Sequence, residues 1–284
     1  MWNKNVVNFL GCDAEYEEAD IVLFGAPFDS TSSFRPGSRF AGQAIRNDSY
    51  GLETYSPYQD ADLTERRIFD MGDLELPIGG SEQALAEIES CTEQILADGK
   101  LPFLIGGEHL VTLGSVRAAA RKYPDLHIIH LDAHTDLREE YLGVQLSHAC
   151  VLRRCWDILG DGRIHQFGIR SGEREEFEWA KEGHTDLHPF HIDELKETME
   201  RLEDFPIYFT VDLDVLDPSF FPGTGTPEPG GISFMSLLHG VTDVCRKSNL
   251  VGCDVNELCP AYDQSGASTA IACKIIREML LAIR

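Results

Sequence analysis

Short apolar runs alternate along this chain with longer amphipathic stretches, and this alternation restricts the fold more than any other sequence feature. Eight runs have the composition of buried strands: 21–24, 68–69, 102–105, 127–131, 164–167, 187–190, 206–211 and 250–255. Five stretches show helical patterns: 81–97, 111–122, 145–159, 233–247 with Ser233 as N-cap, and 267–283. Alternation of this kind predicts an α/β fold, in which a mostly parallel sheet has helices on both faces. No internal repeat or linker interrupts it, so residues 1–284 are expected to form one domain.

Residues with metal-ligand or acid–base character follow three of these apolar runs directly. The three segments are Gly106-Gly107-Glu108-His109, Asp132-Ala133-His134-Thr135-Asp136 and Asp212-Leu213-Asp214. In open parallel sheets, ligands bind at the carboxyl ends of the strands. We therefore expect these three segments to meet at one edge of the sheet.

The middle segment has the spacing of a metal site. Asp132, His134 and Asp136 stand at positions i, i+2 and i+4, and two close carboxylates repel each other unless a cation lies between them. Taken alone, this segment is equally compatible with a solvated acidic loop. Asp212 and Asp214 alone are more typical of a helix cap beside an exposed aspartate, and His109 alone is more typical of an ordinary polar residue at a helix start. Taken together, four aspartates and two histidines are more than one ion needs, which predicts two ions with bridging carboxylates. Mixed His/Asp ligands suit Mn²⁺, Fe²⁺, Co²⁺ or Zn²⁺, and the excess of oxygen favours Mn²⁺.

Composition narrows the classes of partner and compartment. The net charge of −24 argues against nucleic acid and anionic lipid as partners, and it suits a small cationic substrate. No apolar stretch approaches the roughly 18 residues of a membrane span. Residues 1–13 lack the layout of a signal peptide, and the eight cysteines include no C-x-x-C pair. We expect reduced thiols and a cytoplasmic protein.

The third segment continues into a long signature. Residues 210–218 read TVDLDVLDP and residues 222–231 read PGTGTPEPGG. Together with the other two segments, they resemble the three signatures of the ureohydrolase family, which contains arginases and agmatinases. The resemblance runs from residues 25–29 (GAPFD) to the C-terminal helix, and it is strongest to bacterial agmatinases. It implies the arginase-like three-layer αβα fold with an eight-stranded sheet, and a homo-oligomer, either a trimer or a hexamer.

The resemblance also implies a binuclear centre with two Mn²⁺ per chain. One ion would be bound by His109, Asp132, Asp136 and Asp212, and the other by Asp132, His134, Asp212 and Asp214, with Asp132 and Asp212 bridging. Two such ions can hold a hydroxide nucleophile at neutral pH. In this family the hydroxide attacks the guanidinium carbon of the substrate, which then collapses to urea and an amine.

Two further residues take catalytic roles by the same resemblance. His148, in Ser147-His148-Ala149, falls where the family carries the histidine that protonates the leaving amine, a task suited to imidazole near pH 7. Glu257 lies in the 254–263 segment that supplies a carboxylate to anchor the planar guanidinium. Residues 35–40 and 44–46 match a loop and helix start beside the pocket. Residues 168–171 match as well, without an assigned chemistry.

The substrate is expected to be agmatine, which lacks the carboxylate of arginine. Arginases present an asparagine two residues after the last aspartate of the middle segment, and Arg138 replaces it here. Glu173 and the pair Glu139-Glu140 are candidates to meet the distal ammonium of agmatine. Arg138, in contrast, favours a substrate that has a carboxylate, because its guanidinium could pair with that group. Arginase, guanidino-acid hydrolase and aminopropylagmatine ureohydrolase activities therefore stay open as alternatives.

Two rival classes differ from a ureohydrolase in the metal they need. A single-zinc deacetylase on the related fold uses one ion and does not require both His109 and the full Asp/His set. A non-catalytic member that binds a partner protein would be expected to have lost ligands. All six ligand positions hold a residue of the expected type, which disfavours both rivals.

Overall fold

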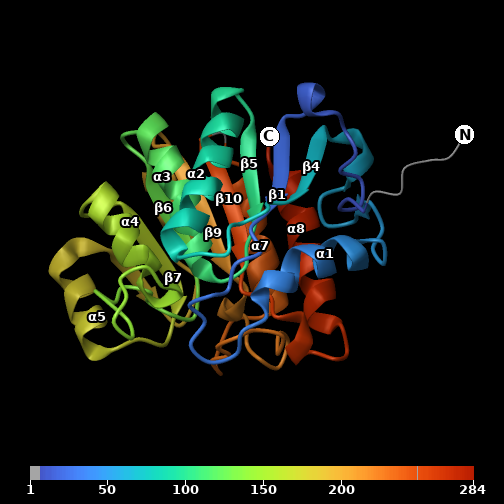
Figure 1. Cartoon of the computed structure of the whole chain (residues 1–284). Helices are drawn as coiled ribbons and strands as arrows, with labels where there is room; N and C mark the ends of the chain where they lie inside the picture. The colour runs from blue at the N-terminus through green and yellow to red at the C-terminus, as the bar shows by residue number, and fades with distance from the viewer. Residues whose placement is uncertain (1–6, 248) are drawn as a thin grey trace, which may run out of the picture.

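The computed structural model describes residues 7–247 and 249–284, and an eight-stranded sheet runs through its centre (Figure 1). The strands are β1 (Ile21–Gly25), β4 (Ile68–Asp73), β5 (Leu101–Ile105), β6 (His127–Leu131), β7 (Ile164–Ile169), β8 (Asp186–Pro189), β9 (Ile207–Asp212) and β10 (Leu250–Asn256). Their order is β4-β1-β5-β10-β9-β6-β7-β8, and every ladder is parallel. Each predicted apolar run is therefore a strand. A two-stranded antiparallel hairpin, β2 (Tyr55–Ser56) and β3 (Ala61–Asp62), was not predicted.

Helices cover both faces of the sheet, as the alternation predicts. The helices are α1 (Ala41–Ser49), α2 (Ser81–Ala97), α3 (Thr112–Lys122), α4 (Val151–Leu159), α5 (Arg174–Trp179), α6 (Leu195–Arg201), α7 (Phe234–Cys245) and α8 (Ala267–Ala282). One apolar cluster joins α2, α3 and α4 to the sheet, and a second joins α1, α6, α7 and α8 to its other face. The three-layer α/β/α prediction is confirmed.

Two details of the helices bear on the sequence analysis. Ser233 caps α7, because its side chain accepts a hydrogen bond from the Ser236 N–H. The predicted helix 145–159 is wrong at residues 145–147, which are not helical, and α4 begins at Val151 after a 3-10 turn at His148–Cys150. Ser147 is extended, and the backbone N–H of His148 donates to Thr31 Oγ1 at 3.0 Å instead of continuing a helix.

The central strands are apolar on both sides, as expected for a sheet covered by helices. In β9, Phe209 packs into one apolar cluster and its neighbour Tyr208 into the other, and both side chains are fully buried. Burying one such ring contributes about 1.5–3 kcal/mol. All eight cysteines are free thiols, in agreement with the expectation of reduced cysteines.

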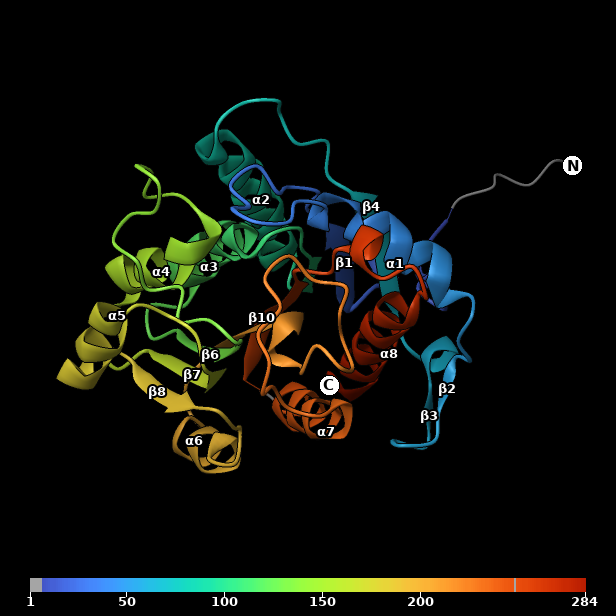
Figure 2. The ribbon, with the colours of Figure 1, turned by 90° about the horizontal axis from the view of Figure 1, so that it is seen from below.

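The strand register places the three sequence segments side by side. Leu131 and Val255 both pair with Val211, and Val255 also pairs with Ile105. The residues that follow these positions are Asp132, Asn256, Asp212 and Gly106, so they form a row across four adjacent central strands. Figure 2 looks onto this end of the sheet, where the connecting loops gather.

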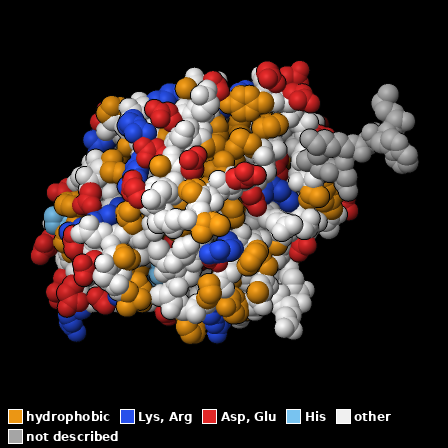
Figure 3. Space-filling model, viewed as in Figure 1, with side chains coloured by type: hydrophobic (Ala, Val, Ile, Leu, Met, Phe, Trp, Pro, Cys, Tyr) orange, Lys and Arg blue, Asp and Glu red, His pale blue; other side chains and the backbone are white. Residues whose placement is uncertain are grey.

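The surface and the chain ends add two findings. Acidic side chains are spread over the face in Figure 3, so the surplus of negative charge is not confined to one cavity. Within residues 7–247 and 249–284, no helix is long and apolar enough to cross a membrane. Residues 1–6 of the N-terminal segment considered above lie outside the described residues.

Candidate metal centre

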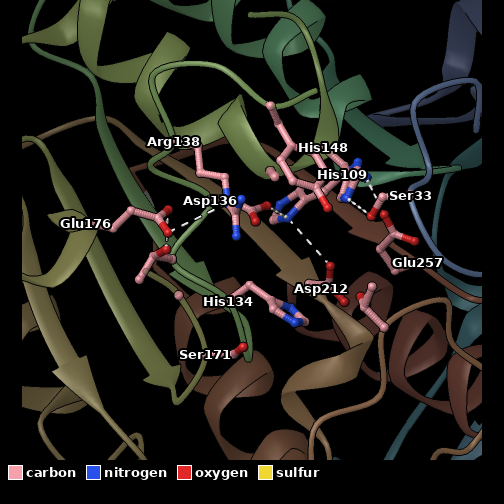
Figure 4. Close-up of a pocket in the computed structure, with 15 residues that line it drawn as sticks. Ser33, His109, His134, Asp136, Arg138, His148, Ser171, Glu176, Asp212 and Glu257 are labelled. Atoms are coloured by element: carbon pink, nitrogen blue, oxygen red, sulfur yellow. Dashed lines mark hydrogen bonds and ion pairs between the residues drawn. The ribbon is translucent and has the colours of Figure 1, made fainter. Parts of the chain in front are cut away.

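Four aspartates and two histidines meet at the carboxyl ends of β5, β6 and β9, as the three segments predict. His109 Nδ1 lies 3.0 Å from Asp132 Oδ2, 3.2 Å from Asp136 Oδ2 and 3.6 Å from Asp212 Oδ2. All four of these residues are buried. Figure 4 shows His109, Asp136 and Asp212 directed toward one cavity.

The remaining two residues form a second group that shares Asp132 with the first. His134 Nδ1 lies 3.0 Å from Asp214 Oδ2 and 3.4 Å from Asp132 Oδ1. Ligand atoms of Asp132, His134 and Asp214 all lie within 4.8 Å of one another, a separation that one metal ion can bridge. The two oxygens of Asp132 therefore face different histidines, which is the arrangement expected of a bridging carboxylate.

Hydrogen bonds behind His109 leave its Nδ1 as an acceptor. Thr210 Oγ1 donates to Asp254 Oδ1 at 2.5 Å, so it accepts from His109 Nε2 at 2.8 Å. In the neutral imidazole, Nε2 then carries the proton and Nδ1 presents its lone pair to Asp132 Oδ2. Although burial opposes it, hydrogen bonds with Asp132 and Asp136 raise the pKa of His109 well above its ordinary value, so without a cation the ring takes up a proton at Nδ1. Two acceptors 3.0 Å apart are unfavourable unless a cation or a proton lies between them. This donor set fits a divalent metal ion.

Crowding of carboxylates points to the same conclusion. Burial and the neighbouring Asp132 raise the pKa of Asp136 to about 7. Burial, Asp214 and Asp132 raise the pKa of Asp212 well above its ordinary value. Full ionisation of the group therefore requires compensating positive charge, and a bound divalent cation supplies it.

Local backbone geometry helps to hold this arrangement. Asp136 and Glu257 have φ values of 51° and 66°, in the left-handed region that non-glycine residues rarely adopt. The Glu257 N–H donates to the carbonyl of Gly107 at 3.0 Å. Gly107 has no room for a side chain, because a Cβ there would lie 2.8 Å from the backbone nitrogen of Phe28 and closer still to its carbonyl oxygen. Left-handed φ values at non-glycine residues, as at Asp136 and Glu257, are typical of functional sites.

A cavity of about 250 Å³ opens above the acidic cluster. Its walls contain His148 and Glu257 beside His109, with Ser33 next to His148 (Figure 4). Glu257 Oε1 accepts the backbone N–H of His109 at 2.8 Å. Burial and Glu108 raise the pKa of Glu257 well above its ordinary value, so its ionised carboxylate would be stabilised by a cationic group beside it.

His148 is fixed from two sides by hydroxyl groups. Its Nδ1 lies 3.4 Å from Thr31 Oγ1, and its Nε2 lies 3.3 Å from Ser33 Oγ. Thr31 is itself held by the buried Glu108, which accepts both the Thr31 hydroxyl and its backbone N–H. Burial and His134 lower the pKa of His148 to about 4, so its imidazole is neutral near pH 7.

The outer wall of the cavity carries an internal ion pair. Arg138 lines the cavity, and its Nη1 lies 2.9 Å from Glu173 Oε1, which is not among the lining residues. The guanidinium also lies 4.5 Å from the centre of the Tyr141 ring. Glu139 pairs with Arg153 at 2.9 Å, away from the lining. The positive charge of Arg138 is thus balanced within the protein.

Two residues that support the site were not identified from the sequence. Glu176 is buried and accepts hydrogen bonds from the Thr135 hydroxyl at 2.6 Å and the Leu137 N–H at 3.0 Å, which fixes the loop after β6. Arg170 directly follows β7 and donates to the backbone carbonyls of Asp214 at 2.7 Å and Glu228 at 2.8 Å. The only sequence signal for Arg170 was the match of residues 168–171 to the ureohydrolase family, and that match did not assign Arg170 a chemical role.

Known proteins share both this sequence and this geometry. The model of the arginase family matches residues 19–282. The agmatinase of Bacillus anthracis is 48% identical over 275 residues, which cover 96% of this chain and 95% of that protein. The chain belongs to the arginase family. The expected resemblance to ureohydrolases is therefore confirmed.

More distant members of the arginase family widen the comparison. The guanidinobutyrase of Pseudomonas aeruginosa is 31% identical over 286 residues, covering 95% of this chain and 88% of that protein. The crystal structure of the agmatine ureohydrolase of Thermoplasma volcanium gives a TM-score of 0.90 at 35% identity, covering 98% of this chain and 94% of that one. The arginase-like fold is confirmed by this agreement.

Proposed function

We propose that this member of the arginase family is an agmatinase, which hydrolyses the guanidino group of agmatine to urea and putrescine. The convergence of two histidines and four aspartates on the floor of a cavity, with His148 and Glu257 in its wall, carries the proposal. The 48% identity to a bacterial agmatinase supports the choice of substrate. Putrescine as a product would place the enzyme in polyamine biosynthesis.

The metal ligands follow from the two groups described above. His109, Asp132, Asp136 and Asp212 would hold one ion, and Asp132, His134, Asp212 and Asp214 the other. When bound, a pair of divalent ions lowers the pKa of water so that a hydroxide nucleophile is available at neutral pH. Manganese is the proposed metal because the ligand set is rich in oxygen.

The side chains in the wall would handle the substrate itself. Glu257 would pair with the planar guanidinium, since its buried carboxylate is stabilised by a cation. His148 would shuttle a proton: its neutral imidazole would first accept one from water and then deliver it to the leaving amine, and its contacts to Thr31 and Ser33 fix the ring for that transfer. Loss of either side chain should therefore affect turnover far more than metal binding.

The balanced charge of the outer wall favours agmatine over a guanidino acid. A free arginine in the wall would attract a substrate carboxylate, but Arg138 is already paired with Glu173. We propose that Arg138, with its charge balanced by Glu173 behind it, lies at the distal end of the substrate without favouring an anion. Guanidinobutyrate hydrolysis is the second candidate, because Arg138 still lines the cavity and a guanidinobutyrase is among the relatives.

Urea release from the Mn²⁺-loaded protein tests the proposal, with agmatine, arginine and 4-guanidinobutyrate compared at equal concentrations. We expect agmatine to be hydrolysed much faster than the other two, with putrescine as the co-product. Preference for arginine or guanidinobutyrate would show that Arg138 binds a carboxylate. Absence of turnover with all three would refute the agmatinase assignment.

A matched pair of variants separates substrate anchoring from surface charge. Glu257→Gln should abolish urea release while the protein retains its metal, since Glu257 is not among the proposed ligands. Glu197→Gln removes an exposed carboxylate from α6, outside the lining of the cavity, and should leave turnover unchanged. The trimeric or hexameric assembly and the cytoplasmic location implied by the resemblance stay predictions.

A further inference from the structure

A third histidine, His130, lies against the acidic cluster and is absent from the ligand set. It is the fourth residue of β6 and is fully buried. Its Nε2 lies 2.8 Å from Asp132 Oδ2, the same oxygen that faces His109 Nδ1. Ligand atoms of His109, His130 and Asp132 all lie within 4.8 Å of one another. By distance alone, His130 would be a seventh metal ligand.

Hydrogen bonds on the far side of the His130 ring decide otherwise. Gln166 Nε2 lies 2.8 Å from the backbone carbonyl of Thr135, which can only accept, so this atom is the amide nitrogen. The Gln166 Oε1 accepts the Thr185 hydroxyl at 3.1 Å, in agreement with that orientation. The second amide hydrogen of Gln166 is left for His130 Nδ1 at 3.1 Å. Nδ1 therefore accepts, and the proton of the neutral ring is on Nε2.

His109 and His130 thus meet Asp132 Oδ2 in opposite ways. In its neutral form, His109 presents a lone pair, because its Nε2–H donates to Thr210 Oγ1. His130 presents an N–H, because Gln166 donates to its other nitrogen. A protonated Nε2 cannot coordinate a metal ion, so His130 is a donor to the carboxylate.

We propose that His130 is a positioning residue that orients the bridging carboxylate of Asp132, an inference that rests on the metal centre of the proposed function. His130 donates to Oδ2 at 2.8 Å, and the His134 N–H donates to Oδ1 at 2.6 Å. Each oxygen then has one lone pair occupied. Oδ2 also lies 3.0 Å from His109 Nδ1 and Oδ1 lies 3.4 Å from His134 Nδ1, so each oxygen would keep a lone pair for the ion of its own group.

The tautomer of His130 is measurable without any metal or substrate. In the metal-free protein labelled with ¹⁵N-histidine, long-range ¹H–¹⁵N NMR distinguishes protonated from unprotonated ring nitrogens. Loss of one signal set in His130→Gln assigns the His130 resonances. We expect the neutral Nε2–H form. The Nδ1–H form would overturn the inference.

Two amide variants then test the effect of the donor on metal binding. The amide nitrogen of glutamine reaches the position of imidazole Nε2, whereas that of asparagine reaches only the position of Nδ1. We expect His130→Asn to weaken Mn²⁺ binding about 10- to 100-fold, the usual effect of losing an outer hydrogen bond to a metal ligand. His130→Gln should restore binding close to that of the unaltered protein.

Titration with Mn²⁺ alone, monitored by calorimetry, gives these affinities. Equal weakening in both variants would overturn the inference, because it would show that the shape of the ring matters and its N–H does not. Unchanged affinity in His130→Asn would overturn it as well. If His130→Asn does not fold, the tautomer measurement decides. Failure of the unaltered protein to hydrolyse agmatine would refute the proposed substrate and leave these measurements intact.

Discussion

Replacing Arg170 by methionine removes a guanidinium that joins the end of β7 to the loop after β9. Its two shortest hydrogen bonds, to the carbonyls of Asp214 and Glu228, measure 2.7 and 2.8 Å. Hydrogen bonds from a charged donor contribute about 1.5–3 kcal/mol each, so these two account for about 3–6 kcal/mol. Arg170 is partly exposed and water can reach the carbonyls, so we expect the lower end, a loss of about 3 kcal/mol.

Urea denaturation of the metal-free protein measures this loss directly. Arg67→Met is the matched control, because Arg67 forms an ion pair with Asp20 in which both side chains are more than half exposed, and such pairs contribute at most about 1 kcal/mol. The change at Arg170 should also lower Mn²⁺ content toward one ion per chain, since Asp214 belongs to only one of the two groups. A difference between the two variants of less than about 1 kcal/mol would refute the structural role of Arg170.

Three further predictions concern packing, metal and pH. Gly107→Ala should destabilise the fold by about 4 kcal/mol or more, because the added Cβ would overlap the Phe28 backbone. Gly79→Ala is the control: the nearest neighbour of its added Cβ would lie at 3.6 Å, so the same urea assay should show a change of less than about 1 kcal/mol. Mn²⁺ at a hundredfold excess over its Kd should stabilise the protein by about 2.7 kcal/mol per site, seen as a rise of several degrees in Tm that EDTA reverses; a Tm unaffected by either would contradict a metal centre. Burial and His165 lower the pKa of His127 to about 4. As the pH falls, the unfolded chain therefore binds a proton at His127 before the folded protein does, and this uptake favours unfolding. Stability should therefore decrease from pH 6.5 to pH 4, and His127→Phe should reduce that decrease in a series of thermal melts.

The strands were predictable because buried parallel strands are continuous apolar runs, and all eight are found where the sequence places them. The helices were predictable where they are long and amphipathic, as in α2 (Ser81–Ala97). The short helices α5 and α6 have six and seven residues, too few to give a clear period. The start of α4 was misjudged because a tertiary hydrogen bond to Thr31 holds His148 outside the helix.

The proposed ligands could be inferred because each follows a strand, and parallel strands bring their carboxyl ends together. The residues behind them left no such signal. Asp254 and Gln166 act through hydrogen bonds whose partners are 44 and 36 residues away in the chain. His130 lies inside an apolar strand, where its polarity was the only indication of a role. Contacts of this kind depend on the sheet order, which the sequence alone did not specify.

The position of β10 has a consequence for how this protein is made. This strand is the last to leave the ribosome, yet it lies in the middle of the sheet, between β5 and β9. Until it arrives, each of those strands has an unpaired edge, and unpaired edges recruit other chains. A nascent or truncated polypeptide that stops before residue 250 therefore exposes two additional unpaired edges, on β5 and β9, in place of a continuous sheet. Synthesis of β10, from Leu250 to Asn256, pairs both edges and removes this aggregation hazard in one step.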